Sequence, residues 1–326
     1  MRLIFLGTPA FAVATLEAVV KAGHEVAAVL TQPDRPRGRG QNAAASPVKQ
    51  TALALGLTVY QPERVRRPEA VEYLRGIGCD AMVVVGYGQI IPQVVIDLAP
   101  LGIINVHASL LPKYRGAGPI QWAIVRGETR TGVTTMRIDA GLDTGDMLLK
   151  AETAIGPEEN AVELGERLAV MGALLLVETL EGLRSGRIVP EKQDDAQATL
   201  APLLKKEDGA IDWSEAARAI HNRVRGLQPW PGARTSFRGV PLHVWKTRAS
   251  ESATRGSGPG DTPHRGIRPT VSPGRVVGVK PLVVACGDGG LELLEVQLEG
   301  RKRISAADFA NGQRLTDNDI LGEALH

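Results

Sequence analysis

Residues 103–120 read I-I-N-V-H-A-S-L-L-P-K-Y-R-G-A-G-P-I. The apolar run at 101–106 predicts a buried strand, and the period of two along a strand puts Asn105 and His107 on one face at its carboxyl end. Open α/β sheets bind their ligands at the carboxyl ends of their strands. An amide and an imidazole there suit chemistry at a carbonyl, because the amide can hydrogen-bond a developing oxyanion and the imidazole can move a proton.

Both side chains also have a structural explanation. A histidine at a strand end is more often a hydrogen-bonded structural residue than a catalyst, and an asparagine near a turn is usually a turn residue. The loop that follows contains Pro112, Gly116 and Gly118. The pair on one face, followed by this loop, makes the catalytic and the structural interpretations about equally favoured, and the spacing alone does not decide between them.

The stretch N-V-H-A-S-L-L-P-K-Y-R-G-A-G-P-I resembles the formyl-transfer motif of enzymes that use 10-formyltetrahydrofolate. Its second half, G-L-D-T-G-D-M at 141–147, follows at the family's spacing. With G-T-P at 7–9 and T-Q-P-D-R-P-R-G-R-G at 31–40, the chain is most similar to the family members that act on methionyl-initiator tRNA. The resemblance covers nearly the whole chain. It implies an enzyme that transfers a formyl group from 10-formyltetrahydrofolate to the α-amine of methionyl-initiator tRNA, for translation initiation.

The resemblance also implies roles for individual residues. Asn105, His107 and Asp143 match the family's catalytic trio, in which the aspartate orients the imidazole. Asp139 and Asp146 lie in the same loop as Asp143 and are expected to be turn and structural residues. The resemblance places the folate near the loop after the strand and near a glycine turn upstream, at Ser109, Leu110, Leu111, Pro112, Gly86 and Tyr87. It places the acceptor end of the tRNA against a loop that carries Arg35, Arg37 and Arg39.

The net charge of +2 hides an uneven distribution. Residues 218–280 contain twelve Lys or Arg and two acids, whereas residues 1–206 contain 22 of each kind. Such a basic block is the footprint expected of phosphate-backbone binding, although a solvated surface or a flexible basic insert would also produce it. In the N-terminal loop, Gln41 and Asn42 stand where the resemblance leads us to expect lysines. This departure weakens the charge of the loop but not its shape.

The N-terminal part alternates short apolar runs with amphipathic segments, which predicts a doubly wound, Rossmann-like α/β domain over residues 1–189. The first turn, G-T-P-A-F, lacks G-x-G-x-x-G, so a dinucleotide site is rejected. Thr8 is expected to cap the helix after this turn, and residues 31–42 read as a loop. Strands are expected at 2–6, 26–31, 58–60, 81–85 and 132–138. Helices are expected at 46–55, 69–76, 120–126 and 161–183.

The C-terminal part predicts a second domain. Residues 190–206 are polar and irregular and read as a linker, and a helix at 211–225 opens a domain over residues 207–326. The stretch 249–272 is rich in Gly, Ser and Pro, and its composition predicts a mobile insert. Short strands predict an OB-type β-barrel, a fold that commonly binds oligonucleotides, at 233–237, 241–246, 274–279, 282–286 and 291–298. A last helix is expected at 306–313.

Composition excludes several classes of protein. The 326 residues are 43% hydrophobic and 23% charged, which is typical of a globular protein. Cys79 and Cys286 lie far apart without a metal-binding spacing, which indicates a reduced compartment, and no metal site is expected. No apolar run approaches the roughly 20 residues of a membrane span, and the chain enters a strand at once, leaving no room for a signal peptide. A cytoplasmic protein with no membrane partner is therefore expected, and the resemblance implies a monomer.

Two other functions stay open. The same trio serves formyltransferases that act on a small amine, such as an amino-sugar nucleotide or glycinamide ribonucleotide, and these would not need a basic barrel. A non-catalytic folate-binding or RNA-binding protein could also be built on this fold. The intact Asn105, His107 and Asp143 argue against that last possibility.

Overall fold

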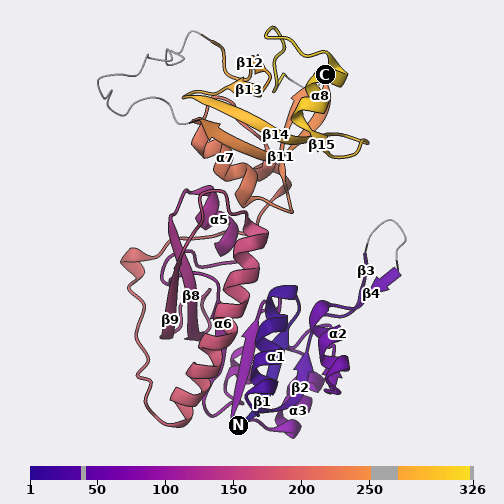
Figure 1. Ribbon diagram of the computed structural model, residues 1–326. Helices are drawn as coiled ribbons and strands as arrows, with labels where there is room; N and C mark the ends of the chain where they lie inside the picture. Colours follow the sequence, from indigo (N-terminus) through magenta and orange to yellow (C-terminus); the bar gives the residue numbers. More distant parts are fainter. Residues whose placement is uncertain (38–41, 251–270, 324–326) are drawn as a thin grey trace. The chain divides into compact units, whose positions relative to one another are not determined.

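The computed structural model describes residues 1–37, 42–250 and 271–323 (Figure 1). Its internal contacts divide the chain into two compact units. The first contains Met1–Pro119, Arg130–Ala154 and Glu163–Pro202. The second contains Leu203–His326 together with two short pieces from earlier in the chain, Ile120–Thr129 and Ile155–Val162. Two short segments of the N-terminal half therefore belong to the second unit, and the chain returns to the first unit after each of them.

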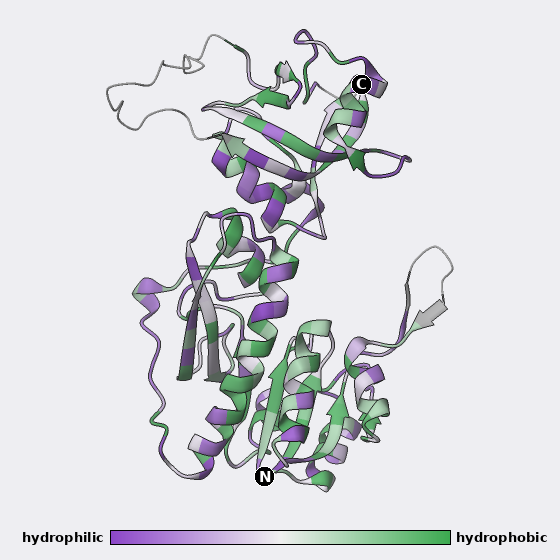
Figure 2. Cartoon of the chain, viewed as in Figure 1, coloured by the Kyte–Doolittle hydropathy of each residue, from purple (hydrophilic) through white to green (hydrophobic). Residues whose placement is uncertain are grey.

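The first unit is built on a seven-stranded sheet with the strand order β5-β2-β1-β6-β7-β8-β9. The strands from β5 to β7 pair in parallel, and β8 and β9 are antiparallel to their neighbours. Figure 2 shows the parallel strands as largely hydrophobic, in keeping with strands buried on both faces. The bounds are β1 Arg2–Gly7, β2 Glu25–Leu30, β5 Val59–Tyr60, β6 Ala81–Val85, β7 Ile103–His107, β8 Arg130–Arg137 and β9 Met147–Ala154. The doubly wound α/β fold predicted from the sequence is confirmed.

Most helices that connect these strands lie where the sequence predicts them, but the short helix at Gln93–Ile96 was not predicted. In α2 (Pro47–Ala54), Ser46 caps the first turn by accepting a hydrogen bond from the Lys49 amide at 3.1 Å, and proline suits the first helical position. In α6 (Ala161–Arg184), Gly172 allows close packing on the sheet, because an added Cβ would lie 2.7 Å from Val106 Cγ1. The other helices are η1 Ala10–Ala12, α1 Val13–Lys21, α3 Pro68–Ile77, α4 Gln93–Ile96 and α5 Pro119–Val125.

Two predictions for the first unit were wrong, and one strand was missed. Thr8 makes no helix cap, because its hydroxyl donates to the Tyr87 carbonyl at 3.1 Å. The stretch read as a loop contains a short antiparallel hairpin, β3 (Arg35–Arg37) with β4 (Asn42–Ala44), which ladder hydrogen bonds form despite a composition unlike that of strands. Strand β9 was not predicted, although its alternating burial reflects a period of two.

The second unit holds an antiparallel sheet with the order β10-β11-β14-β13-β12, and β15 pairs with β14. Its final segment joins the two ends of this sheet. The Gly322 amide donates to Ser236 of β10 at 2.9 Å, and the Leu321 amide donates to Gly274, just before β12, at 2.8 Å. This closure suits the barrel predicted from the sequence. The bounds are β10 Ala233–Phe237, β11 Val240–Ser250, β12 Val276–Val279, β13 Leu282–Ala285, β14 Gly290–Leu298, β15 Ile304–Ser305 and α8 Ala306–Gln313.

Helix α7 (Ala217–Gly226) packs within the second unit but is shorter than predicted. Residues 211–216 are not helical, because the Ile211 amide pairs with the Arg234 carbonyl at 2.8 Å and Asp212 closes a turn onto Ser214. The tight packing of α7 on α5 requires glycine at its end, since a Cβ on Gly226 would lie 2.8 Å from Val125. Most of the predicted insert, residues 251–270, lies outside the described residues.

Candidate active site

Asn105 and His107 lie side by side on one face of β7, as the period of two predicts. Both are buried, at 9% and 5% exposure. The His107 imidazole is held at Nε2, which lies 2.9 Å from the Tyr114 carbonyl oxygen. Among the residues that the structure describes, the side-chain amide of Asn105 has no hydrogen-bond partner. Buried amides normally find partners, so this one is available to a ligand.

The loop between β8 and β9 brings Asp143 to the same place. One carboxylate oxygen, Oδ2, lies 3.7 Å from His107 Nδ1 and accepts a hydrogen bond from the Gly116 amide at 2.8 Å. Asp139 accepts from the Gly141 amide and the Thr144 hydroxyl within this loop, at 3.0 and 2.8 Å, which fits the turn role expected of it. The structure thus brings together the three residues that the sequence singled out.

The loop after β7 is held by its own side chains. Ser109 is fully buried and donates to the Lys113 carbonyl at 2.6 Å, and Leu111 packs with Met136 and Met147. Leu110 and Pro112 keep partial exposure. Within 109–112, therefore, only these two side chains and the backbone are free to face a ligand. The folate contact predicted for this loop stays a prediction.

The glycine turn after β6 contributes through its backbone. The side chain of Tyr87 is 2% exposed inside a hydrophobic cluster, and burial raises the pKa of its phenol. Its carbonyl accepts from Thr8 Oγ1 at 3.1 Å and from Gln32 Nε2 at 3.0 Å. Gly86 has a φ of +58°, and a Cβ there would meet Pro9 at 2.8 Å. The turn therefore needs glycine to pass this close to the first loop.

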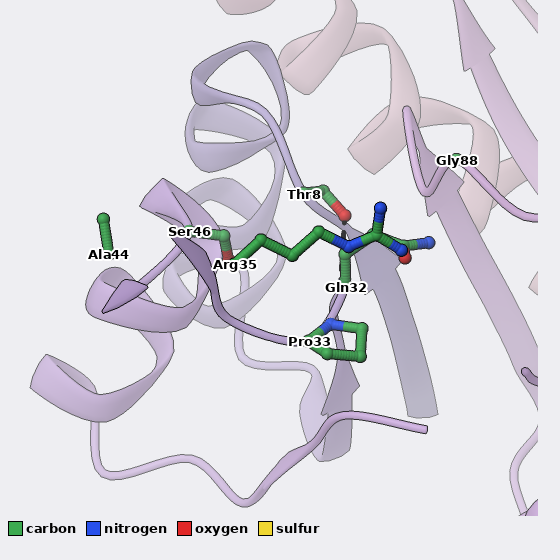
Figure 3. A pocket seen from close by; sticks show the side chains of 7 residues that line it. All are labelled: Thr8, Gln32, Pro33, Arg35, Ala44, Ser46 and Gly88. Atoms are coloured by element: carbon green, nitrogen blue, oxygen red, sulfur yellow. Dashed lines mark hydrogen bonds between the residues drawn. The ribbon is translucent and has the colours of Figure 1, made fainter. Parts of the chain in front are cut away.

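A pocket of about 340 Å³ opens beyond the carboxyl ends of β1 and β2 and reaches Gly88 after β6, beside the point between β1 and β6 where the strand order reverses (Figure 3). Ligands of doubly wound sheets bind at such a switch point. Figure 3 shows the Arg35 side chain extending toward Thr8 and Gln32, and within the described part of the chain its guanidinium has no partner. The lining residues are Thr8, Gln32, Pro33, Arg35, Ala44, Ser46 and Gly88.

The structure describes less of the other arginines that are predicted to contact tRNA. The backbone of Arg37 lies in β3, and Arg39 and Gln41 lie outside the described residues. In the basic block at residues 218–280, several of the positive charges are not available to a phosphate. Arg225 is buried, and three other arginines pair with acids outside the block: Arg223 with Glu215, Arg238 with Asp319 and Arg248 with Glu292.

No group of three or more potential metal ligands occurs in the described ranges, and no described helix is long and apolar enough to cross a membrane. Burial raises the pKa of Cys79 to about 11 and that of Cys286 to about 12. A thiolate is the nucleophilic form of cysteine, so neither residue is activated at neutral pH.

Comparison with known proteins places the chain among the formyl transferases. A family model described as formyl transferase matches residues 1–180, and its C-terminal domain model matches residues 203–314. Methionyl-tRNA formyltransferase of Solibacter usitatus (strain Ellin6076) is 77% identical over 323 residues, which cover 99% of each chain. The chain therefore belongs to the methionyl-tRNA formyltransferase family.

Two solved structures share the fold at low identity. WlaRD, a sugar 3N-formyl transferase solved in the presence of dTDP and 5-N-formyl-THF, is 17% identical with a TM-score of 0.63, covering 93% of this chain and 99% of that one. HypX from Aquifex aeolicus, solved in complex with tetrahydrofolic acid, is 16% identical with a TM-score of 0.61, covering 95% and 47%. At these identities the likeness concerns the fold alone.

Proposed function

We propose that this protein transfers the formyl group of 10-formyltetrahydrofolate to the α-amine of methionyl-initiator tRNA, as a cytoplasmic monomer. The observation that carries the chemistry is the free amide of Asn105 beside the His107–Asp143 pair. A largely buried donor that no described residue occupies is what a developing oxyanion requires. The identity of 77% with a methionyl-tRNA formyltransferase carries the choice of acceptor.

The three residues divide the work. The Asn105 amide would donate a hydrogen bond to the formyl oxygen as negative charge develops there. With the Tyr114 carbonyl 2.9 Å from Nε2, the neutral imidazole of His107 keeps its proton on Nε2, and Nδ1 is the acceptor. His107 would take the proton that the attacking amine loses and pass it to the leaving nitrogen of the donor, and Asp143 would stabilise the imidazolium formed between. The amine attacks unprotonated, a form that a partly desolvated site favours.

The folate supplies the activated formyl group, and the residues at this edge of the sheet fit its flat ring. Two neighbouring loops expose an apolar side chain: Ile90 is 91% exposed after the glycine turn, and Leu142 is 64% exposed next to Asp143. With Leu110 and Pro112, they offer apolar surface around the catalytic trio. We propose that these residues and the backbone of Gly86 hold the folate.

For the acceptor we propose the pocket at the switch point. One strand, β6, lies between β1 and β7, so the pocket is about 10 Å across the sheet from the trio. An aminoacyl nucleotide can bridge such a span with its amine at His107. Arg35, whose charge has no protein partner in the described chain, would then contact a phosphate of the acceptor end. Arg37 and Arg39 are proposed to extend this contact along the acceptor end.

The test is formyl transfer from labelled 10-formyltetrahydrofolate to charged initiator tRNA. Wild type is expected to form formyl-methionyl-tRNA, and His107→Ala is expected to lose roughly 100-fold or more in kcat, as for removal of a general acid–base group. His24→Ala is the matched control, because His24 is a partly buried histidine just before β2 whose side chain, among the described residues, bonds only the N-terminus. Amino-sugar nucleotides and glycinamide ribonucleotide serve as competing acceptors.

The outcomes separate the alternatives. Transfer to a small amine but not to tRNA would keep the chemistry and overturn the acceptor. Folate binding without transfer to any acceptor would overturn the enzyme and leave a binding protein. Equal loss of activity in His24→Ala and His107→Ala would show that the loss reports unfolding rather than chemistry.

A further inference from the structure

Residues 191–201, here named the strap, run along the catalytic loops although they lie far from them in sequence. The sequence predicts this stretch to be part of a linker, yet it belongs to the first unit, and its backbone pairs with other residues of that unit at both ends. Met147 and Glu191 exchange two hydrogen bonds of 2.8 Å. Arg115 donates to the Thr199 carbonyl at 2.8 Å and accepts from the Ala201 amide at 2.7 Å. The strap is therefore bonded to the loop that follows β7 and to the first residue of β9.

Gln193 is the centre of the strap. Its Nε2 donates to the carbonyl of Asp143 and to the carbonyl of Gly145, each at 2.8 Å. Its Oε1 accepts from Nε of Arg115 at 2.9 Å. Because arginine can only donate, Oε1 must face Arg115, and Nε2 must then face the two carbonyls. The orientation of this amide is thus fixed by its partners.

Arg115 ties the two catalytic loops together. It is 7% exposed, and besides Gln193 it binds Asp195 in the strap, with Nη2 2.7 Å from Oδ1. The next residue, Gly116, donates its amide to the Asp143 carboxylate. Asp143 is therefore held at both ends, its carboxylate by the loop of Arg115 and its carbonyl by Gln193.

The backbone at Asp143 explains why this support is needed. Its φ is +53°, a left-handed conformation that a residue with a side chain adopts at some cost and keeps only when neighbours fix it. Tyr114, whose carbonyl holds His107, has a φ of +62°. Its amide donates to Thr199 Oγ1 of the strap at 2.9 Å. Both left-handed residues that touch the histidine are thus braced by the strap.

We propose that Gln193 is a positioning residue, which sets the carboxylate of Asp143 toward His107 through the backbone of the loop. The inference rests on the proposed function for its activity readout. A small displacement of a reacting group is enough to slow a reaction by orders of magnitude. Loss of the Gln193 amide should therefore act on the chemical step and leave the binding of donor and acceptor nearly unchanged.

The test compares Gln193→Met, which keeps the length of the side chain without its hydrogen bonds, with Gln193→Glu. The glutamate can still accept from Arg115, so the strap stays attached, but it cannot donate to the two carbonyls. Both variants are expected to lower kcat by roughly 10- to 100-fold with KM for donor and acceptor changed less than about threefold. Gln197→Met is the matched control, because Gln197 is an exposed glutamine of the same strap that bonds only Asp194.

A second readout does not depend on activity. The NMR signals of the His107 ring, assigned by their loss in His107→Ala, are expected to move in both Gln193 variants and to stay in place in Gln197→Met. Lower thermal stability with unchanged kcat and unchanged His107 signals would overturn the proposal and make the strap a purely structural element. If wild type transfers no formyl group to any acceptor, the proposed function fails, and moved His107 signals would still support the positioning role.

Discussion

The end of β7 and the face of α7 each hold a buried histidine, a buried asparagine and a charged side chain. At β7 these are His107, Asn105 and Asp143. On α7 they are His221, Asn222 and Arg225, which lie within about one turn of the helix. Their exposed fractions are 2%, 5% and 7%. Composition and burial are thus closely similar, and a histidine of either kind would look the same in a sequence.

The two clusters differ in how their polar atoms are satisfied. His221 has Nδ1 3.0 Å from Thr247 Oγ1 and Nε2 3.3 Å from the Pro157 carbonyl oxygen. Arg225 donates to Asn222 Oδ1 and to two backbone carbonyls of the inserted piece, those of Gly156 and Glu159. These bonds anchor residues 156–159 to α7 within the second unit.

At β7, by contrast, some side-chain hydrogen-bonding groups are not used by the described protein. The Asn105 amide has no partner in the described chain, and His107 Nδ1 lies 3.7 Å from Asp143, beyond hydrogen-bond length. Because the Asn105 side chain keeps some exposure, its amide can be reached by a ligand that completes the cluster. The contrast indicates that spare bonding capacity, rather than residue type or burial, separates the catalytic cluster from the structural one.

Among variants that test this difference between the two clusters, Asn105→Ala is expected to have the largest effect on kcat. The variant should lose roughly 100- to 1000-fold in kcat, the loss seen when one oxyanion donor is removed. Its free energy of unfolding should change by less than about 1 kcal/mol, because no protein hydrogen bond is lost. Formyl-transfer kinetics and urea unfolding measure the two. A stability loss of several kcal/mol with kcat retained would place Asn105 with the structural residues.

The opposite pattern is expected from Arg225→Met. Removing the guanidinium takes a donor away from the partly buried carbonyls of Gly156 and Glu159 and from the buried Asn222 Oδ1, which should cost about 2–4 kcal/mol of stability. At a temperature where the variant is folded, kcat should equal that of wild type. Urea unfolding followed by the fluorescence of the second unit's tryptophans gives the first quantity. A fall in kcat without a loss of stability would contradict the structural assignment of the α7 cluster.

Local patterns in the sequence explain what could be predicted of these sites. The period of two along β7 places Asn105 and His107, and apolar runs place most strands, because both signals lie within a few neighbouring residues. Asp143 has no such signal and was identified only through resemblance to a family. The strap escaped prediction because its hydrogen bonds join Gln193 to residues about fifty positions earlier and leave no periodic trace. For the same reason the sequence cannot tell His221 from His107.

The smallest effect that sharpens the comparison is the pH dependence of the α7 cluster. Burial lowers the pKa of His221, while the nearby carboxylate of Glu158 raises it in part and Arg225 and Arg218 lower it further. Because the pKa in the folded protein lies below the ordinary value of 6.5, the unfolded chain takes up a proton first as the pH falls. The stability due to neutral His221 is therefore complete above about pH 6.5 and declines below it, toward the folded pKa.

One proton limits the size of this decline to about 1.4 kcal/mol for each pH unit. His221→Gln removes the titration and leaves an amide that can still bond at this position. Urea unfolding of wild type and His221→Gln at pH 7.5 and 5.5 should therefore show a smaller pH-dependent loss in the variant, while His24 and His243, whose pKa values burial also lowers, contribute equally to both proteins. Equal losses would mean that His221 is protonated as readily in the folded cluster as in the unfolded chain. The α7 cluster could then accept a further proton without losing stability. Its hydrogen bonds would no longer distinguish it from the cluster at β7.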